Sequence, residues 1–274
     1  FQDDWKLRPN LTLNLGMRYE YFSSPNQRGP SSNFDLNGVV PGFIVSRQTY
    51  LGFTDISNST GVPQNLVAAD KNNFGPRIGF AYSPGWIKDF VVRGGYGIYF
   101  FPEITNTYLN LTLNPPIVVS HSYTGSIGDT VNPATVFLSG VAGESKDGLD
   151  GAYAIDPNLA SGYGQSWNLT LQKKLPGRIY VETAYVGTAG KNLSTQYDGN
   201  RPIQPVVPGR GVPSVSARRP LQGYDNITTV KSLAQATYHS FQMKVERRVA
   251  SGLTILGAYT WAHAIDSADS STVG

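Results

Sequence analysis

Residues 11–22, LTLNLGMRYEYF, alternate without interruption between apolar and polar side chains. A period of two puts successive side chains on opposite sides of a strand, so the segment predicts a strand with one apolar and one polar face. It is about twice as long as a typical strand of about five to six residues. A long strand that carries Arg18 and Glu20 opposite a run of Leu favours a membrane barrel wall, where one face meets lipid and the other a wet lumen.

Similar strand patterns recur in pairs, and each pair is joined by a short turn. The turn Ala250-Ser251-Gly252 has its Gly where a three-residue hairpin requires a positive φ. Long segments rich in Gly, Pro, Ser, Asn and Asp separate the pairs, and this asymmetry is typical of barrels with short periplasmic turns and long extracellular loops. The predicted hairpins are 1–22, 74–101, 164–190 and 237–265, and the predicted long loops are 23–73, 102–163 and 191–236.

We therefore predict an all-β fold: an antiparallel up-and-down transmembrane β-barrel, with about eight strands present in one domain over residues 1–274. The alternative is a soluble two-layer sandwich, whose strands also alternate but are shorter and have turns about every 8–12 residues. One residue does not fit the apolar face. Asp3 would lie on it unless a bulge near Arg8-Pro9-Asn10 shifts the register.

The polar face supplies a set of candidate functional residues. We expect it to line the lumen, where charged side chains form cross-strand ion pairs, border a substrate path or hold a plug. The predicted lumen-facing residues are Arg18, Glu20, Arg77, Arg93, Glu182, Lys244 and Glu246.

The apolar face predicts where the membrane ends. Its aromatic residues lie about six to ten positions from the short turns, as an outer interfacial girdle would. These aromatic residues are Tyr19, Tyr21, Phe100, Trp167, Tyr185, Phe241, Tyr259 and Trp261. Lys173 and Arg247 interrupt the same face close to the short turns, so we expect them at the periplasmic interface, where long basic side chains reach the headgroups.

Composition excludes several function classes. A net charge of +3 with 15% charged residues is too weak to predict nucleic-acid binding. The absence of Cys excludes disulfides and thiolate metal sites. No apolar run is long enough for a transmembrane helix. The chain starts at Phe1 inside a predicted strand, so we expect it to be a piece of a longer protein.

The chemistry candidates are weak. His239 and His263 should lie opposite each other, and such a pair could bind a divalent metal, although two interfacial residues is the simpler interpretation. Asp266, Asp269, Ser267, Ser270 and Ser271 could suggest a Ser/His/Asp hydrolase with His263, but such residues are ordinary content where a long loop begins. The basic segment 209–220 could contact lipopolysaccharide phosphates or another anion. We expect no catalytic site, no metal and no cofactor.

Several strand segments resemble one family. The segments QDDWKLRPNLTLNLGMRYEYF, NNFGPRIGFAYSP, VVRGGYGIYF, SWNLTLQKKLPGRIYVETAYVGTAGKNL and YHSFQMKVERRVASGLTILGAYTWAHAID look like barrel segments of TonB-dependent outer-membrane receptors, closest to the Oar-like branch with a carboxypeptidase-regulatory-like domain. The resemblance implies a 22-stranded barrel with a plug, which here would be absent, in the Gram-negative outer membrane. It also implies energised uptake of a scarce siderophore, oligosaccharide or peptide, with outer-membrane lipid, lipopolysaccharide and the TonB complex as partners.

Two other functions remain open. A passive pore or an adhesive surface protein would use the same wall, and a soluble carbohydrate-binding β module would show similar alternation. A plug and a TonB box upstream would favour the transporter, whereas solubility without detergent would favour the soluble module.

Overall fold

The computed structural model describes residues 1–23, 31–36, 42–45, 63, 65–115, 117–118, 151–203, 213–249 and 252–267. Its main feature is one sheet of eight long strands in the order β1-β2-β5-β6-β8-β9-β10-β11, in which all neighbours are antiparallel. The strands are β1 (Gln2–Arg8), β2 (Leu11–Tyr19), β5 (Phe74–Tyr82), β6 (Phe90–Phe101), β8 (Gly162–Leu175), β9 (Ile179–Asp198), β10 (Ile227–Arg248) and β11 (Thr254–Asp266).

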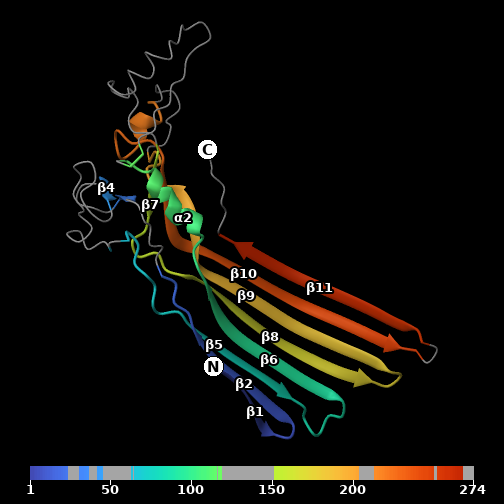
Figure 1. The fold of residues 1–274 in the computed structure, drawn as a ribbon. Coiled ribbons are helices and arrows are strands. Elements are labelled where there is room, and N and C mark those ends of the chain that lie inside the picture. The colour runs from blue at the N-terminus through green and yellow to red at the C-terminus, as the bar shows by residue number, and fades with distance from the viewer. Residues whose placement is uncertain are drawn as a thin grey trace.

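The sheet has one short-turn end and one loop end. The turns after β1, β5, β8 and β10 lie together at the lower right of Figure 1, and the long connections lie together at the upper left. Each strand follows its neighbour directly, which is the up-and-down order predicted from the sequence. Within the described residues the sheet is open, with β1 and β11 as its edges.

The predicted register is confirmed. Phe241 pairs with Trp261 across the last turn, and Trp167 pairs with Gly187 across the turn before it. Gly252 has a φ of +84°, as the predicted turn requires. A one-residue slip would move every side chain to the other face, so the alternation in the sequence fixes this pairing strongly.

The first turn differs from the prediction. It consists of Pro9 and Asn10 alone, with an irregularity between Lys6 and Arg8. This bulge does not rescue Asp3, because Asp3 still pairs with Leu15 and therefore shares its face. Leu7 is the extra residue of the bulge and has no partner in β2, and the pairing of the other residues is unchanged.

The predicted loop boundaries are wrong at two places. The sequence predicts a long loop over 191–236, but β9 continues to Asp198 and β10 begins at Ile227, so paired strands extend well beyond the predicted hairpin. The predicted hairpin 1–22 also ends early, because β2 stops at Tyr19. The extension beyond residue 190 has irregular register near Ser232 and Ala234, which breaks the period of two by which a strand is recognised.

The long connections also contain short elements of their own. These are β3 (Ser32–Asp35), β4 (Gly42–Val45), β7 (Ala152–Ile155), the helix α2 (Thr105–Leu109), and the 3-10 helices η1 (Asn110–Leu113) and η2 (Ser216–Arg218). β3 and β4 form a hairpin, and β7 pairs in parallel with the loop end of β10. None of the helices in the described segments has the length and hydropathy needed to span a bilayer.

The buried hydrophobic clusters lie in these connections and at the loop end of β10, and not between the long strands toward the short turns. We call β3, β4, β7, α2, η1 and the loop end of β10 the cap. One buried cluster contains Ile44, Leu66, Val67, Leu111, Ile155, Leu159 and Val230, and a second contains Phe34, Ala152, Ala154 and Ile227. The long strands leave many large apolar side chains exposed, as a wall must if lipid is to cover it.

Candidate functional site

One face of the sheet is apolar in successive rows of paired residues. One row crosses all eight strands through Asp3, Leu15, Ile78, Tyr96, Trp167, Gly187, His239 and His263. The next row toward the short turns is Trp5, Leu13, Phe80, Gly94, Leu169, Tyr185, Phe241 and Trp261. Trp261 is 69% exposed and Ile78 is 55% exposed, so this face is not covered by the protein.

The opposite face is polar. Its rows include Asp4, Asn14, Gly79, Gly95, Asn168, Val186 and Ser240 near the middle, and Val91, Gln172, Glu182 and Lys244 nearer the short turns. All seven residues predicted to face a lumen fall on this side. Arg18 and Glu20 form an ion pair of 2.9 Å at the loop end, although Glu20 lies just beyond β2.

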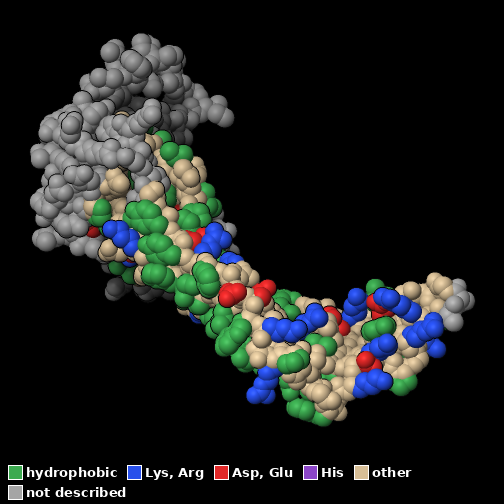
Figure 2. All heavy atoms as spheres, turned by 60° about the horizontal axis from the view of Figure 1, so that its bottom comes forward, with side chains coloured by type: hydrophobic (Ala, Val, Ile, Leu, Met, Phe, Trp, Pro, Cys, Tyr) green, Lys and Arg blue, Asp and Glu red, His purple; other side chains and the backbone are tan. Residues whose placement is uncertain are grey.

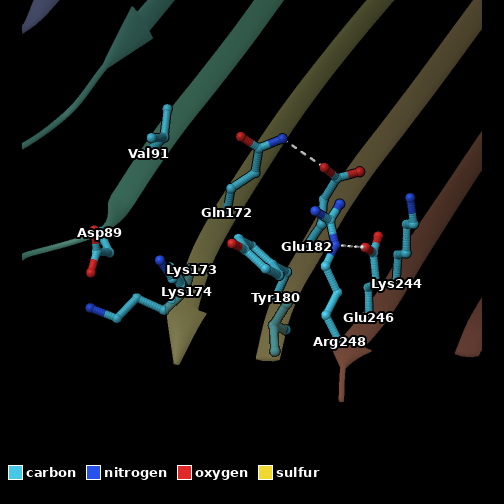
Figure 3. A pocket seen from close by; sticks show the side chains of 11 residues that line it. Asp89, Val91, Gln172, Lys173, Lys174, Tyr180, Glu182, Lys244, Glu246 and Arg248 are labelled. Atoms are coloured by element: carbon cyan, nitrogen blue, oxygen red, sulfur yellow. Dashed lines mark hydrogen bonds and ion pairs between the residues drawn. The ribbon is translucent and has the colours of Figure 1, made fainter. Parts of the chain in front are cut away.

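Charged side chains of the polar face gather toward the short turns (Figure 2). There they line a hollow of about 420 Å³ across β6, β8, β9 and β10 (Figure 3). Glu246 binds Arg248 at 2.7 Å, and the Gln172 amide donates to Glu182 at 2.6 Å. Lys174 and Arg248 each lie 5.7 Å from the Tyr180 ring. Acidic and basic side chains are mixed here, so the hollow has no preference for one sign of charge.

The aromatic residues predicted at the membrane interface do not all lie in the same row. Trp167 on β8 lies in the row of His239, whereas Tyr185, Phe241 and Trp261 lie one row closer to the short turns. The turns step in the same direction, because the row at Leu11 beside the first turn runs on to Met243, well before the last turn. Rows and turns therefore shift together, as they do in a sheet of tilted, staggered strands.

Tyr19, Phe100 and Tyr21 lie near the loop end. The centroids of the Tyr19 and Phe74 rings are 4.8 Å apart, and those of the Phe100 and Tyr163 rings, which are tilted by 40°, are 5.6 Å apart. Tyr21 lies beyond the end of β2, in the wall of a hollow and not on a strand.

The two basic residues of the apolar face lie close to the short turns, as the sequence predicts. The Lys173 ammonium donates to the Lys88 carbonyl in the turn before β6, at 2.7 Å. Arg247 pairs in register with Ile179, the first residue of β9, and with Ile255, the second residue of β11. Both charged groups therefore lie within reach of the short-turn end of the sheet.

His239 on β10 and His263 on β11 pair in register. The ring of His239, however, makes its contacts with residues of β9 and β8, on the side of β10 away from His263. The Tyr185 hydroxyl lies 2.7 Å from His239 Nδ1, and the two rings stack at 18°. The Trp167 ring is 5.8 Å from the His239 ring, across Gly187. Among the described residues no group of three metal-ligating side chains occurs. The arrangement supports an aromatic cluster on this face more than a metal-binding pair.

Buried Asn side chains hold the cap together. Asn33 pairs with both backbone groups of Ile155, donating to its carbonyl at 2.7 Å and accepting from its amide at 2.8 Å. Asn114 makes the same two contacts with Tyr153 and also donates to Ser32. These side chains satisfy backbone groups that would otherwise be buried without partners.

A buried Arg fixes the connection between β9 and β10. Arg219 binds Asp198 at the end of β9 at 2.6 Å and Asp225 at 2.9 Å, and it also donates to the Asn200 carbonyl. The Asn200 amide in turn donates to the carbonyls of Leu221, Tyr224 and Asp225. The described part of this connection is therefore an ordered structure, with a charged network at its centre.

Sequence reasoning missed the cap, the Asn contacts and the Arg219 network. Asn33 and Ile155 are far apart along the chain, and a single Asn in a segment rich in polar residues gives no periodic signal. The basic segment 209–220 contains Arg219, but its first residues, 209–212, lie outside the described residues. Asp269, Ser270 and Ser271 of the considered hydrolase set lie outside them too.

Comparison with known proteins places these features in context. The family model described as outer membrane beta barrel domain matches residues 1–274. A comparison with curated proteins finds no match. Similar solved structures include the siderophore receptor PirA from Pseudomonas aeruginosa (13% identity, TM-score 0.43), the alcaligin outer membrane receptor FauA from Bordetella pertussis (15%, 0.41) and the FrpB iron transporter from Neisseria meningitidis (11%, 0.43). The alignments cover 96%, 96% and 94% of this chain but 33%, 29% and 24% of those chains, so the chain spans about a quarter to a third of their length.

Proposed function

Because the chain belongs to the family of outer membrane beta barrel domains, we propose that it forms part of the wall of a TonB-dependent transporter. Family membership makes it an outer membrane beta barrel domain of a Gram-negative bacterium and not an enzyme. In our proposal the extracellular cap takes part in binding a scarce small ligand, and the polar face borders its path inward. Energy for uptake comes from the TonB complex through a part of the protein outside this chain.

The observation that carries the proposal is the polar face. It continues from the ion pair of Arg18 and Glu20 at the loop end to the charged hollow at the short turns. A wall facing lipid on one side needs polar side chains on the other only if water, a plug or a substrate lies there. The proposal therefore assigns this face to the lumen and the apolar face, with its aromatic residues, to lipid and lipopolysaccharide.

The packed cap supports a binding role for the extracellular connections. Its hydrophobic clusters and buried Asn contacts order segments that come from three separate loops. Ordering before binding lowers the entropic cost of binding a ligand. The resemblance of the strand segments to TonB-dependent receptors supports the energised mechanism over a passive pore.

The conductance of the full-length protein in planar lipid bilayers tests this proposal. A plugged transporter should show no stable open channel, because its lumen is filled. A large and steady conductance would favour the passive pore. Calorimetry of the binding of the purified periplasmic domain of TonB to the full-length protein tests the energy source. An absence of binding would overturn the proposed TonB coupling.

A further inference from the structure

A second hollow, of about 300 Å³, lies where the cap meets the loop ends of the strands. Tyr21 and Phe22 line it after β2, Glu103 and Tyr108 line it after β6, and Asp70 lines it before β5. It is thus built from two connections, the one between β2 and β5 and the one between β6 and β8, which meet at the loop end of the sheet. Its volume is at the lower limit of pockets that bind small molecules.

The walls of this hollow combine aromatic rings with two carboxylates. Tyr21, Phe22 and Tyr108 supply rings, Asp70 and Glu103 supply carboxylates, and no Lys or Arg is among the described residues that line it. It differs in this respect from the hollow at the short turns, which mixes both signs of charge. The surroundings are therefore electronegative, both from the carboxylates and from the faces of the rings.

Both carboxylates are held in place by neutral donors. Asp70 accepts from the backbone amide of Ser161 at 2.9 Å and from that of Asn72 at 3.3 Å. Glu103 accepts from the Thr107 hydroxyl at 2.9 Å. Within the described residues neither carboxylate has a Lys, Arg or His in ion-pair contact. Two positioned carboxylates without a cationic partner leave their charge available to a ligand.

Tyr108 fits this role in its neutral form. It is partly buried and packs against the hydrophobic cluster of the cap. Burial, and then the negative charge of Glu103, raises the pKa of its phenol above the ordinary value. The ring therefore carries no negative charge at neutral pH, and it presents an aromatic wall backed by the cap.

We propose that this hollow binds a small organic cation through an alkylammonium group, with Glu103 and Asp70 as its counter-charges and Tyr108, Tyr21 and Phe22 as its aromatic walls. An ammonium carrying alkyl groups suits this combination, because it gains from ring faces and carboxylates together. An anionic ligand would meet two negative charges that no Lys or Arg of the described lining compensates. This inference rests on the proposed function, since it names the ligand class that the extracellular end would take.

Choline and 3,3-dimethylbutan-1-ol provide the test, because they have nearly the same shape and differ in charge. Both are titrated calorimetrically into the full-length protein that contains this chain, purified in detergent. Choline should bind at least about tenfold more tightly than the neutral alcohol, as expected when cation–π and charge contacts act together. Equal affinities, or no binding of choline, would overturn the proposal.

Variants locate the site. Glu103→Gln should weaken choline binding about 3- to 30-fold and leave the alcohol unaffected. Tyr108→Phe should retain binding and Tyr108→Leu should lose it. Asp156→Asn is a matched control, since it removes one negative charge directly after β7, outside the hollow, while keeping an acceptor for the Asn158 amide. An equal loss in this control would mean that general charge, and not the hollow, attracts the cation.

The test separates this inference from the proposed function. Binding is measured on purified protein without TonB or an energy source, so it can fail while TonB coupling and the closed lumen hold. Conversely, choline could bind at this hollow in a protein that proves to be an open pore. A heat-modifiability gel on each variant confirms that its barrel is folded before its affinity is compared.

Discussion

Trp167 lies across Gly187, and its indole occupies the space that a side chain at Gly187 would fill. A Cβ built on Gly187 would come within 2.3 Å of the Trp167 ring. The same relationship joins Phe80 to Gly94 and Tyr99 to Gly164. These three glycines therefore leave room for aromatic rings on the neighbouring strand, and the Trp167 ring extends over Gly187 to lie 5.8 Å from the His239 ring.

We expect Gly187→Ala to displace the Trp167 ring and to destabilise the barrel by about 1–3 kcal/mol, as overpacking does. Thermal unfolding in detergent and the tryptophan emission maximum would both report the change. Gly257→Ala is the matched control, because it lies in the neighbouring region of the same face and a Cβ there meets nothing within 4 Å. If both variants unfold at the same temperature, the ring does not depend on the glycine.

Leu15→Arg should block insertion far more than Asn14→Arg. Leu15 lies on the apolar face and is 40% exposed, so an Arg there would meet lipid at a cost of about 2–4 kcal/mol near the bilayer centre. Asn14 lies on the polar face and donates to Asp4 at 2.5 Å, so an Arg there would have a carboxylate partner. The folded fraction on a heat-modifiability gel measures the difference. Equal fractions would contradict the assignment of the two faces.

Arg219→Met should loosen the connection between β9 and β10. It removes the partner of Asp198 and Asp225, whose side chains are 22% and 58% exposed. Since water screens the more exposed pair, Arg219 with Asp225, the free energy of unfolding should fall by at most about 3 kcal/mol. Limited proteolysis should cut within residues 199–226 faster than in the wild type, with the barrel intact. Arg201→Met, which alters an exposed Arg in the same connection, should leave the cleavage rate unchanged.

The raised pKa of Tyr108 predicts a pH dependence of the cap. The unfolded chain loses the phenol proton at the ordinary pKa, whereas the folded protein retains it, so this residue makes folding less favourable as pH rises above that value. The ultraviolet titration difference between wild type and Tyr108→Phe would isolate this phenol. Glu103→Gln should lower the pKa only in part, because burial is the larger cause. A complete return to the ordinary value would show that the charge of Glu103 dominates.

The wall could be predicted because its determinants are local. Alternation along each strand fixes the faces, and a turn such as 176–178 fixes which residues pair, so Leu175 opposite Ile179 follows from a few adjacent residues. The bulge at Leu7 could not be predicted in the same way. It changes the turn length without changing the register, so the apolar pattern is the same with or without it.

The cap could not be predicted, since its determinants are distant in sequence. Phe34, Ala152 and Ile227 pack in one cluster although each comes from a different connection. Asn114 contacts Tyr153 by a side chain whose chemistry equally suits an ordinary loop. The hollow lined by Tyr21 depends on the same long-range contacts. The alternation of residues 11–22 does not contain this information and therefore predicts an interfacial aromatic residue at Tyr21.

The position of the buried core has a consequence for biogenesis. Ile44, Leu111, Ile155 and Val230 can meet only after the strands that carry their connections have reached their final places. Closing such distant contacts is the slow part of folding, so the cap should form last. A conformation-specific antibody against the cap would then recognise finished molecules on living cells and ignore precursors, which would make the cap a surface marker of completed assembly.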